Sequence, residues 1–165
     1  MTKFNIGVIG SDGKISKKVE KMAELIGRDI AKNNCILICG GRSGVMEAAC
    51  RGTKKENGTT VGILPVMNKK EANRYVDVIL TTSLGYARNA LVASCSDAVI
   101  AIRGGVGTLS EIAMALNYKK PVLVVKGSGG VADSIGSEFE RDGEKVKIQS
   151  VKAEDAVKTA LRMIK

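Results

Sequence analysis

Histidine is absent from the 165 residues of this sequence, and its absence excludes several kinds of chemistry. Without an imidazole there is no Ser-His-Asp or Cys-His nucleophilic site, no histidine-ligated zinc and no histidine proton shuttle. Any reaction that the protein catalyses must use carboxylates, arginine, lysine, cysteine, tyrosine or the backbone. We expect no metal site, and no cofactor that catalysis would require.

Aromatic residues are scarce: they make up 3% of the chain, and tryptophan is absent. The core must then be built from valine, isoleucine, leucine and alanine, which is typical of a parallel sheet covered by helices. The formal net charge is +9, but the lysines are scattered over presumed helix surfaces and few rings are available for base stacking. This disfavours nucleic-acid binding. The charge instead favours a small phosphorylated ligand.

The four cysteines, Cys35, Cys39, Cys50 and Cys95, contain no C-x-x-C pair, and three of them lie in apolar runs. We interpret them as buried free thiols in a reducing compartment. No apolar run approaches the length of a membrane span, and the N-terminus leads into a short strand without a signal-peptide core. We therefore expect a cytoplasmic protein with no membrane partner.

Strand-like and helix-like segments alternate along the whole chain, without a linker, a repeat or a low-complexity tract. This alternation predicts a single domain, residues 1–165, with an α/β fold: a doubly wound, Rossmann-like parallel sheet of about seven strands with helices on both faces. The expected strands are Phe4–Ile9, Cys35–Cys39, Thr60–Leu64, Val76–Thr81, Ala98–Ile102, Val122–Val125 and Lys147–Gln149. The expected helices are Ile15–Asn33, Gly44–Lys55, Leu84–Ser94, Leu109–Tyr118, Val131–Glu140 and Ala153–Met163.

The most informative stretch of the chain joins a strand-like run to a helix-like one and is rich in glycine. Glycines let the backbone come close to a ligand, and a helix start offers unpaired N–H groups and a positive dipole end. The pattern predicts a site for a phosphate or a similar anion. Its predicted contacts are Arg103, Gly104, Gly105, Val106, Gly107 and Thr108.

Two further loops follow strands in the same way. Parallel sheets bind ligands beyond the carboxyl ends of their strands, so these loops should gather with the main one at a single edge. The first loop lacks the G-x-G-x-x-G fingerprint, and no acidic residue ends the second strand, which disfavours an NAD-dependent oxidoreductase. The predicted ligand contacts here are Gly10, Ser11, Gly40, Gly41, Arg42 and Gly44.

Glu111 and Arg88 are the candidate reactive residues, and each has a structural alternative. Thr108 and Glu111 fit a capping box, in which Glu111 reaches back to the start of its helix. The same carboxylate could face the ligand, stabilise an oxocarbenium-like centre or direct a water. Arg88 could clamp a phosphate or be a solvated helix arginine. The loop Gly127–Gly130 is better explained as a plain turn than as a further ligand loop.

These residues resemble the nucleotide-binding family that includes the lonely-guy cytokinin-activating phosphoribohydrolases, the proteins long labelled "possible lysine decarboxylase" and the molybdenum-cofactor carrier proteins. The family motif P-G-G-x-G-T-x-x-E is matched from Gly104 to Glu111, and G-G-x-x-G-x-M is matched from Gly40 to Met46. The resemblance covers nearly the whole chain. It implies a homodimer or higher homo-oligomer, and Arg88 and Glu111 match the family's functional arginine and glutamate.

The resemblance leaves two functions open. A phosphoribohydrolase would cleave the N-glycosidic bond of a nucleoside 5′-monophosphate, with Arg88 and Glu111 as its catalytic residues. A carrier or sensor would bind a nucleotide or a phosphorylated pterin, such as molybdenum cofactor, without transforming it. Arg103 stands where the hydrolases have proline, and Asn89 stands where they have lysine, which makes the chain more similar to the carriers. No lysine has a recognisable pyridoxal-phosphate setting, so a lysine decarboxylase is not expected.

Overall fold

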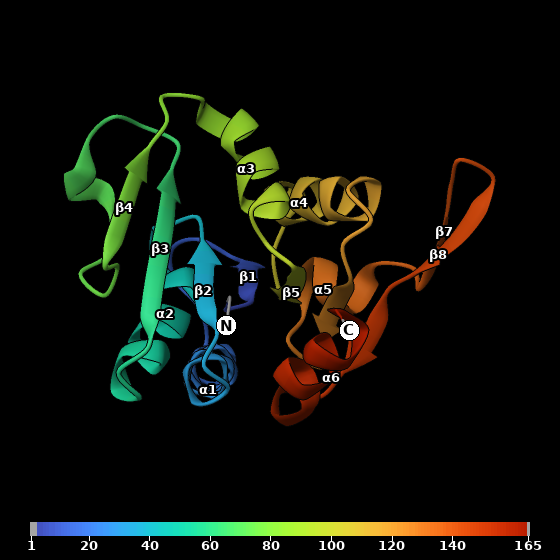
Figure 1. The fold of residues 1–165 in the computed structure, drawn as a ribbon, viewed down its shortest axis with the longest axis horizontal. Coiled ribbons are helices and arrows are strands. Elements are labelled where there is room, and N and C mark those ends of the chain that lie inside the picture. The colour runs from blue at the N-terminus through green and yellow to red at the C-terminus, as the bar shows by residue number, and fades with distance from the viewer. Residues whose placement is uncertain (1–2, 165) are drawn as a thin grey trace.

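The computed structural model describes residues 3–164, and a parallel seven-stranded sheet forms its centre (Figure 1). The strand order is β4-β3-β2-β1-β5-β6-β9. The strands are β1 (Asn5–Gly10), β2 (Ile36–Cys39), β3 (Thr59–Leu64), β4 (Val78–Thr81), β5 (Ala98–Ile102), β6 (Val122–Val125) and β9 (Gln149–Val151). The predicted α/β, Rossmann-like class is confirmed.

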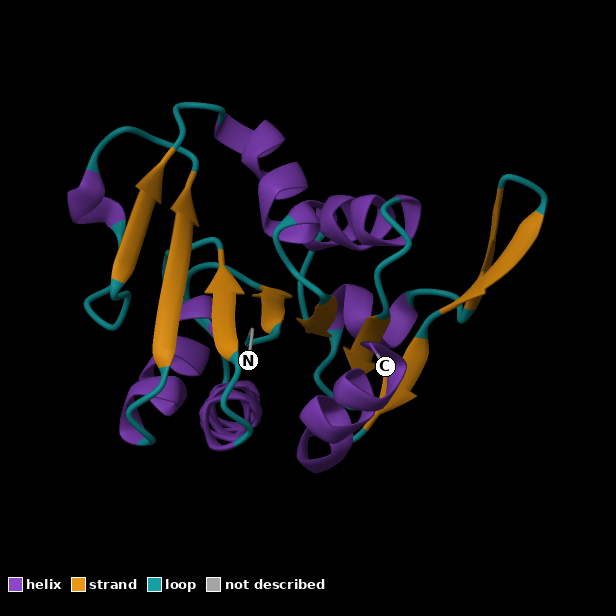
Figure 2. Cartoon of the chain, in the orientation of Figure 1, coloured by secondary structure: helices purple, strands orange, loops and turns teal. Residues whose placement is uncertain are grey.

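Helices cover both faces of this sheet (Figure 2). One face carries α1 (Lys17–Lys32), α2 (Val45–Lys55) and α6 (Ala156–Ile164). The other carries α3 (Asn89–Ser94), α4 (Val106–Asn117) and α5 (Gly130–Ser134). The described part of the chain also contains three short 3-10 helices: η1 (Lys69–Glu71), η2 (Gly85–Arg88) and η3 (Ala153–Asp155).

The central strands are apolar on both sides because both faces of the sheet are covered. Along β1, Ile6 and Val8 pack into the core beneath α1 and α2, whereas Ile9 packs into the core beneath α3 and α4. All five residues of β5 are buried. Aliphatic side chains suit both cores, which accounts for the scarcity of aromatic residues.

The strand order reverses between β1 and β5, and this reversal determines where a ligand can enter. The two strands pair in parallel with Gly10 opposite Ile102, so their loops leave from the same edge. The connection after β1 leads to α1 on one face, and the connection after β5 leads to α4 on the other. Loops that diverge in this way leave a crevice between them.

The predicted helix Val131–Glu140 is wrong beyond its first turn. After α5 the chain forms a hairpin of β7 (Glu138–Arg141) and β8 (Glu144–Lys147), which projects from the body of the protein (Figure 1). Asp142 and Gly143 form its turn, both with positive φ, which is the signature of a tight hairpin. The last strand of the main sheet consequently starts at Gln149 rather than Lys147.

The four cysteines differ in their exposure to solvent. Cys35, Cys39 and Cys50 are buried, as predicted, but Cys95 is exposed, so the prediction of a buried thiol is wrong for that residue. Among residues 3–164, no helix combines the length and the apolar character that crossing a membrane demands.

Candidate functional site

A cleft of about 250 Å³ lies where the loops after β1, β2 and β5 meet. Its walls come from these loops, from the junction of η2 and α3, and from the first turns of α4. The sheet thus brings segments that are far apart in the sequence to one edge. Of the predicted site residues, the cleft is lined by Gly10, Ser11, Gly40, Arg42, Arg88, Gly105, Gly107, Thr108 and Glu111.

Arg88 and Glu111 are a buried pair of opposite charge in this cleft. Arg88 ends η2 and Glu111 lies in the second turn of α4. Their side chains are only 10% and 9% exposed, and Nη1 of Arg88 lies 3.9 Å from Oε1 of Glu111. Nε of Arg88 is buried and has no hydrogen-bond partner among residues 3–164. Incompletely paired charges of this kind are costly to bury and are characteristic of functional sites.

The environment of this pair brings Glu111 close to neutral titration. Burial raises the pKa of Glu111 to about 7, although the nearby guanidinium of Arg88 opposes the shift. Burial also lowers the pKa of Arg88, and the Glu111 carboxylate opposes that shift. A carboxyl group with a pKa near 7 can both hold and release a proton near neutral pH, as general acid–base chemistry requires.

Gly40 provides the space that Arg88 occupies. A Cβ built on Gly40 would overlap Nη1 of Arg88 and would lie 2.8 Å from its Cζ and Nη2. The guanidinium therefore lies directly against the backbone at the end of β2. The second glycine loop thus contributes to the site by positioning a side chain as well as by lining the cleft.

Helix α4, which follows the main glycine loop, begins at Val106 rather than at the predicted Leu109. The N-cap of α4 is Gly105, and no side chain of residues 3–164 caps this end. Thr108 is buried in the first turn, where a Cβ on Gly104 would overlap its side chain. The capping-box interpretation of Thr108 and Glu111 is therefore wrong. The first N–H groups of α4 have no side-chain cap at a helix end that borders the cleft.

Asp12 is a cleft residue that the sequence analysis missed. Its Oδ1 accepts hydrogen bonds from the hydroxyl of Ser43 at 2.6 Å and from the backbone N–H of Gly13 at 2.9 Å. Its Oδ2 lies 3.4 Å from Nη1 of Arg42, whose Nη2 lies 3.8 Å from Glu71. Burial raises the pKa of Asp12, but its hydrogen bonds and Arg42 outweigh burial and leave the pKa below its ordinary value. Asp12 thus joins the loops after β1 and β2.

Five other cleft residues were not predicted as contacts: Val8 and Ile9 of β1, and Met46, Tyr86 and Asn89. Asn89 is buried, and its Nδ2 donates to the hydroxyl of Ser110 at 3.0 Å, which ties α3 to α4. Its position directly after Arg88 in the sequence could have indicated that it lies in the site. Tyr86 lines the cleft and is 89% exposed. A ring this exposed is not part of a core, so the spacing of apolar residues in the sequence does not point to it.

The remaining predicted contacts, Gly41, Gly44, Arg103, Gly104 and Val106, do not line the cleft. Gly41 and Gly44 both have positive φ and approach other backbone segments closely, so they shape the loop after β2. Val106 is 84% exposed. Gly41 and Gly44 thus support the loop after β2, and Val106 lies beside the cleft without lining it.

Arg103 points toward the loop between β6 and α5. Its backbone N–H donates to the hydroxyl of Ser128 at 2.8 Å, and its guanidinium lies beside Gly129. In the same loop, the N–H groups of Gly127 and Gly129 donate to the carboxylate of Asp133 at 2.8 and 2.7 Å. Because the chain's own carboxylate occupies these donors, the plain-turn interpretation of this loop agrees with the geometry.

The fold and the cleft define a Rossmann-like α/β protein with a polar, partly buried site at the reversal of strand order. The chain belongs to the SLOG cluster4 family, whose model matches residues 3–159.

Three relatives show the range of proteins to which this chain is similar. The molybdenum cofactor binding protein from Rippkaea orientalis is 32% identical with a TM-score of 0.85, and the match covers 100% of this chain and 99% of that one. The molybdenum cofactor carrier protein from Chlamydomonas reinhardtii is 30% identical with a TM-score of 0.81, with 99% of each chain covered. The cytokinin riboside 5′-monophosphate phosphoribohydrolase of Rhodococcoides fascians is 32% identical over 61% of this chain, a match that spans 53% of that enzyme. The predicted resemblance to lonely-guy and carrier proteins is confirmed.

Proposed function

We propose that the cleft binds a phosphorylated, nucleotide-like ligand and that the protein is a carrier of a phosphorylated pterin of the molybdenum-cofactor type. The observation that carries the proposal is the meeting of an uncapped helix start with a buried arginine. The first turn of α4 offers N–H groups and a positive dipole end, and Arg88 adds a cation. Gly105 and Gly107 keep side chains out of the space that a phosphate would need.

The comparisons support the carrier over other ligand-binding functions. The two molybdenum-cofactor proteins match this chain along essentially its full length, whereas the hydrolase matches over about half of its own length. The two residues that set the chain apart from the hydrolases are Arg103 and Asn89. Asn89 lines the cleft and links α3 to α4, so a substitution here alters the wall of the site.

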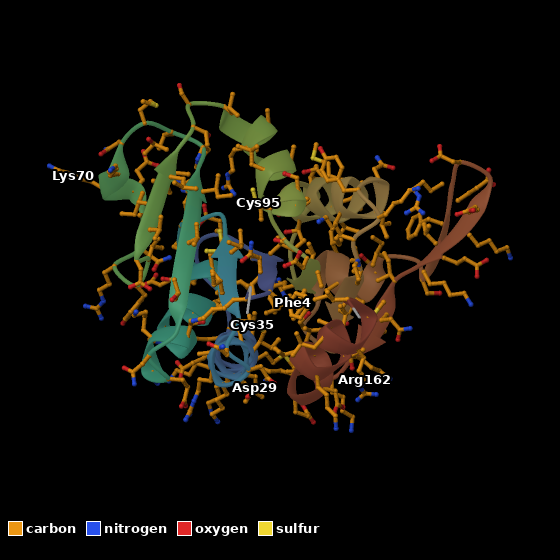
Figure 3. The ribbon with its side chains drawn as sticks, in the orientation of Figure 1. Phe4, Asp29, Cys35, Lys70, Cys95 and Arg162 are labelled. Carbon is orange, nitrogen blue, oxygen red and sulfur yellow. The ribbon has the colours of Figure 1, made fainter. Side chains whose placement is uncertain are left out.

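Native mass spectrometry tests the carrier proposal. Protein purified from a host that makes molybdenum cofactor should retain a phosphorylated pterin, and Arg88→Ala should lose it. Arg162, labelled in Figure 3, is exposed on α6. Arg162→Ala is therefore the matched control and should retain the pterin. If the wild-type protein holds no phosphorylated pterin, even after incubation with molybdenum cofactor, the carrier proposal is wrong.

A second candidate function is favoured by the Arg88–Glu111 pair itself. In a phosphoribohydrolase, water adds to C1′ of a nucleoside 5′-monophosphate, the bond to the base breaks, and the base leaves with a proton. Glu111 as carboxylate would stabilise the positive charge that develops on the ribose, or would orient the water. Arg88 would hold the substrate in position.

An assay for ribose 5-phosphate separates the two candidates. The protein is incubated with a panel of nucleoside 5′-monophosphates, and Glu111→Gln is compared with Glu154→Gln, which changes an exposed glutamate far along the chain. The hydrolase proposal expects release that Glu111→Gln lowers by about 100-fold or more and that Glu154→Gln leaves intact. If no monophosphate yields ribose 5-phosphate, this second candidate is excluded.

We also propose the homodimer that the family resemblance implies. Large apolar side chains lie exposed at and beside the cleft, among them Tyr86, Leu84 and Val106. Exposed apolar groups that gather in one area are typical of association surfaces. Light scattering coupled to size-exclusion chromatography should give twice the mass of the chain, and Val106→Lys should shift it toward the monomer.

A further inference from the structure

Cys39 and Cys50 form a buried pair of thiols beside the candidate site. Their sulfur atoms lie 3.6 Å apart, Cys39 at the end of β2 and Cys50 in α2. Both side chains are fully buried. The other two cysteines, Cys35 and Cys95, lie at the opposite edge of the sheet, before β2 and β5 respectively, and are labelled in Figure 3. The close pair therefore has no competing thiol at its own edge.

This pair encloses the loop that positions Arg88. Residues 40–44 run from Cys39 to the start of α2, and Gly40 is the residue against which the Arg88 guanidinium lies. The N–H of Gly41 donates to the sulfur of Cys39 at 3.3 Å. Gly40 and Gly41 directly follow Cys39, so a change at the Cys39 sulfur would be transmitted through them to the contact between Gly40 and Arg88.

The chemistry of the pair favours Cys39 as the reactive member. The hydrogen bond from Cys50 lowers the pKa of the Cys39 thiol, burial opposes this shift, and the Gly41 N–H supports it. The thiolate is the form of cysteine that peroxides oxidise. Because both sulfurs are buried, the oxidant must be small and uncharged, and hydrogen peroxide meets both conditions.

We propose that Cys39 and Cys50 are a modification site, at which a peroxide forms a disulfide that changes the loop holding Arg88. In the first step the Cys39 thiolate attacks the O–O bond, which gives a sulfenic acid and releases water after protonation. In the second step the Cys50 sulfur attacks the sulfenic sulfur, and the departing hydroxide takes the Cys50 proton to leave as water. Two thiols lose two electrons, and one peroxide becomes two waters.

Mass spectrometry of the full chain tests the modification. Hydrogen peroxide should remove the mass of two hydrogens, and dithiothreitol should restore it. After the remaining thiols are alkylated, trypsin should yield residues 33–42 joined to residues 43–51. Cys35 shares the first of these peptides, so a Cys35→Ala background identifies Cys39 as the partner. Cys50→Ala should abolish the crosslink and Cys95→Ala should not. An unlinked pair after peroxide treatment, or a link through Cys35, overturns the proposal.

Hydrogen exchange tests whether the disulfide reaches the loop. Loss of the Cys39 sulfur as acceptor should speed exchange of the Gly41 amide by roughly 2- to 10-fold, the range for one hydrogen bond. Amides of β9, on the far side of the sheet, should exchange at the same rate in both forms. Unchanged exchange at Gly41 in the disulfide form would contradict the proposed coupling. Neither measurement requires a ligand, so both are independent of the proposed function.

Discussion

The guanidinium of Arg88 lies so close to the backbone of Gly40 that any β-carbon at this position would overlap it. Arg88 in turn faces Glu111 at 3.9 Å, so a glycine at the end of β2 controls the charge around a carboxylate in α4. Gly40, Arg88 and Glu111 come from three separate segments of the chain and meet at this guanidinium.

Gly40→Ala should raise the pKa of Glu111 above about 7. The added methyl group displaces the guanidinium, and a carboxylate that loses a nearby cation is harder to ionise. An NMR titration of glutamate carboxyl carbons measures this directly. Arg88→Ala should raise the same pKa. The double variant should raise it no further, because both changes remove the same interaction, that between Arg88 and Glu111. Gly136→Ala is the control, since a Cβ there meets Phe139 at an ordinary 3.9 Å.

Glu111→Gln should make the protein more stable at pH 8 than the wild type, and this advantage should shrink toward pH 5. The folded-state pKa of Glu111 is raised to about 7, so its contribution to stability is fully present below the unfolded value and is lost as pH rises through 7. The glutamine resembles the protonated acid and does not titrate. Urea unfolding at several pH values should show a divergence of at most about 3 kcal/mol. Parallel stability curves for the two proteins would contradict the assignment.

The fold was predictable because its signals are local and repeated. Buried apolar runs such as Ala98–Ile102 alternate with helical patterns, and each glycine loop follows a strand. The hairpin of β7 and β8 was missed because the polar residues around Phe139 fit the surface of a helix as well as that of a strand. The local signal for this hairpin is the Asp142-Gly143 pair, which is typical of a tight turn between strands.

The site was predictable only in part, because several of its interactions depend on tertiary structure. Arg88 and Glu111 were predicted from their places near the glycine loops and matched the family's functional residues, but their contact and burial depend on the packing of α3 against α4. Asp12 was missed because its main partner, Ser43, is 31 residues away in the sequence. Gly40 was assigned to the ligand, and only the structure reveals that its missing side chain makes room for Arg88.

Asp133→Ala should destabilise the protein by about 1 kcal/mol without altering the cleft. The carboxylate accepts the N–H groups of Gly127 and Gly129, and the substitution leaves both donors to water. Chemical denaturation measures the loss, with Asp155→Ala as the control for removing an exposed carboxylate elsewhere. If this loop instead binds an external anion, Asp133→Ala would free its donors and make added phosphate stabilising. A phosphate-dependent gain in the variant would therefore contradict the plain-turn assignment.

Gly27→Ala should destabilise the protein by about 1–3 kcal/mol, because α1 and α2 pack backbone to backbone at this point. A Cβ on Gly27 would overlap the carbonyl oxygen of Ala49, and one on Gly52 would overlap that of Glu24. Backbone atoms cannot rotate away as a side chain can, so the helices must separate. Helix propensity alone would favour alanine, so the two effects have opposite signs. Urea unfolding beside Gly136→Ala decides between them: a Gly27→Ala protein as stable as the control would mean that the helices do not pack this closely.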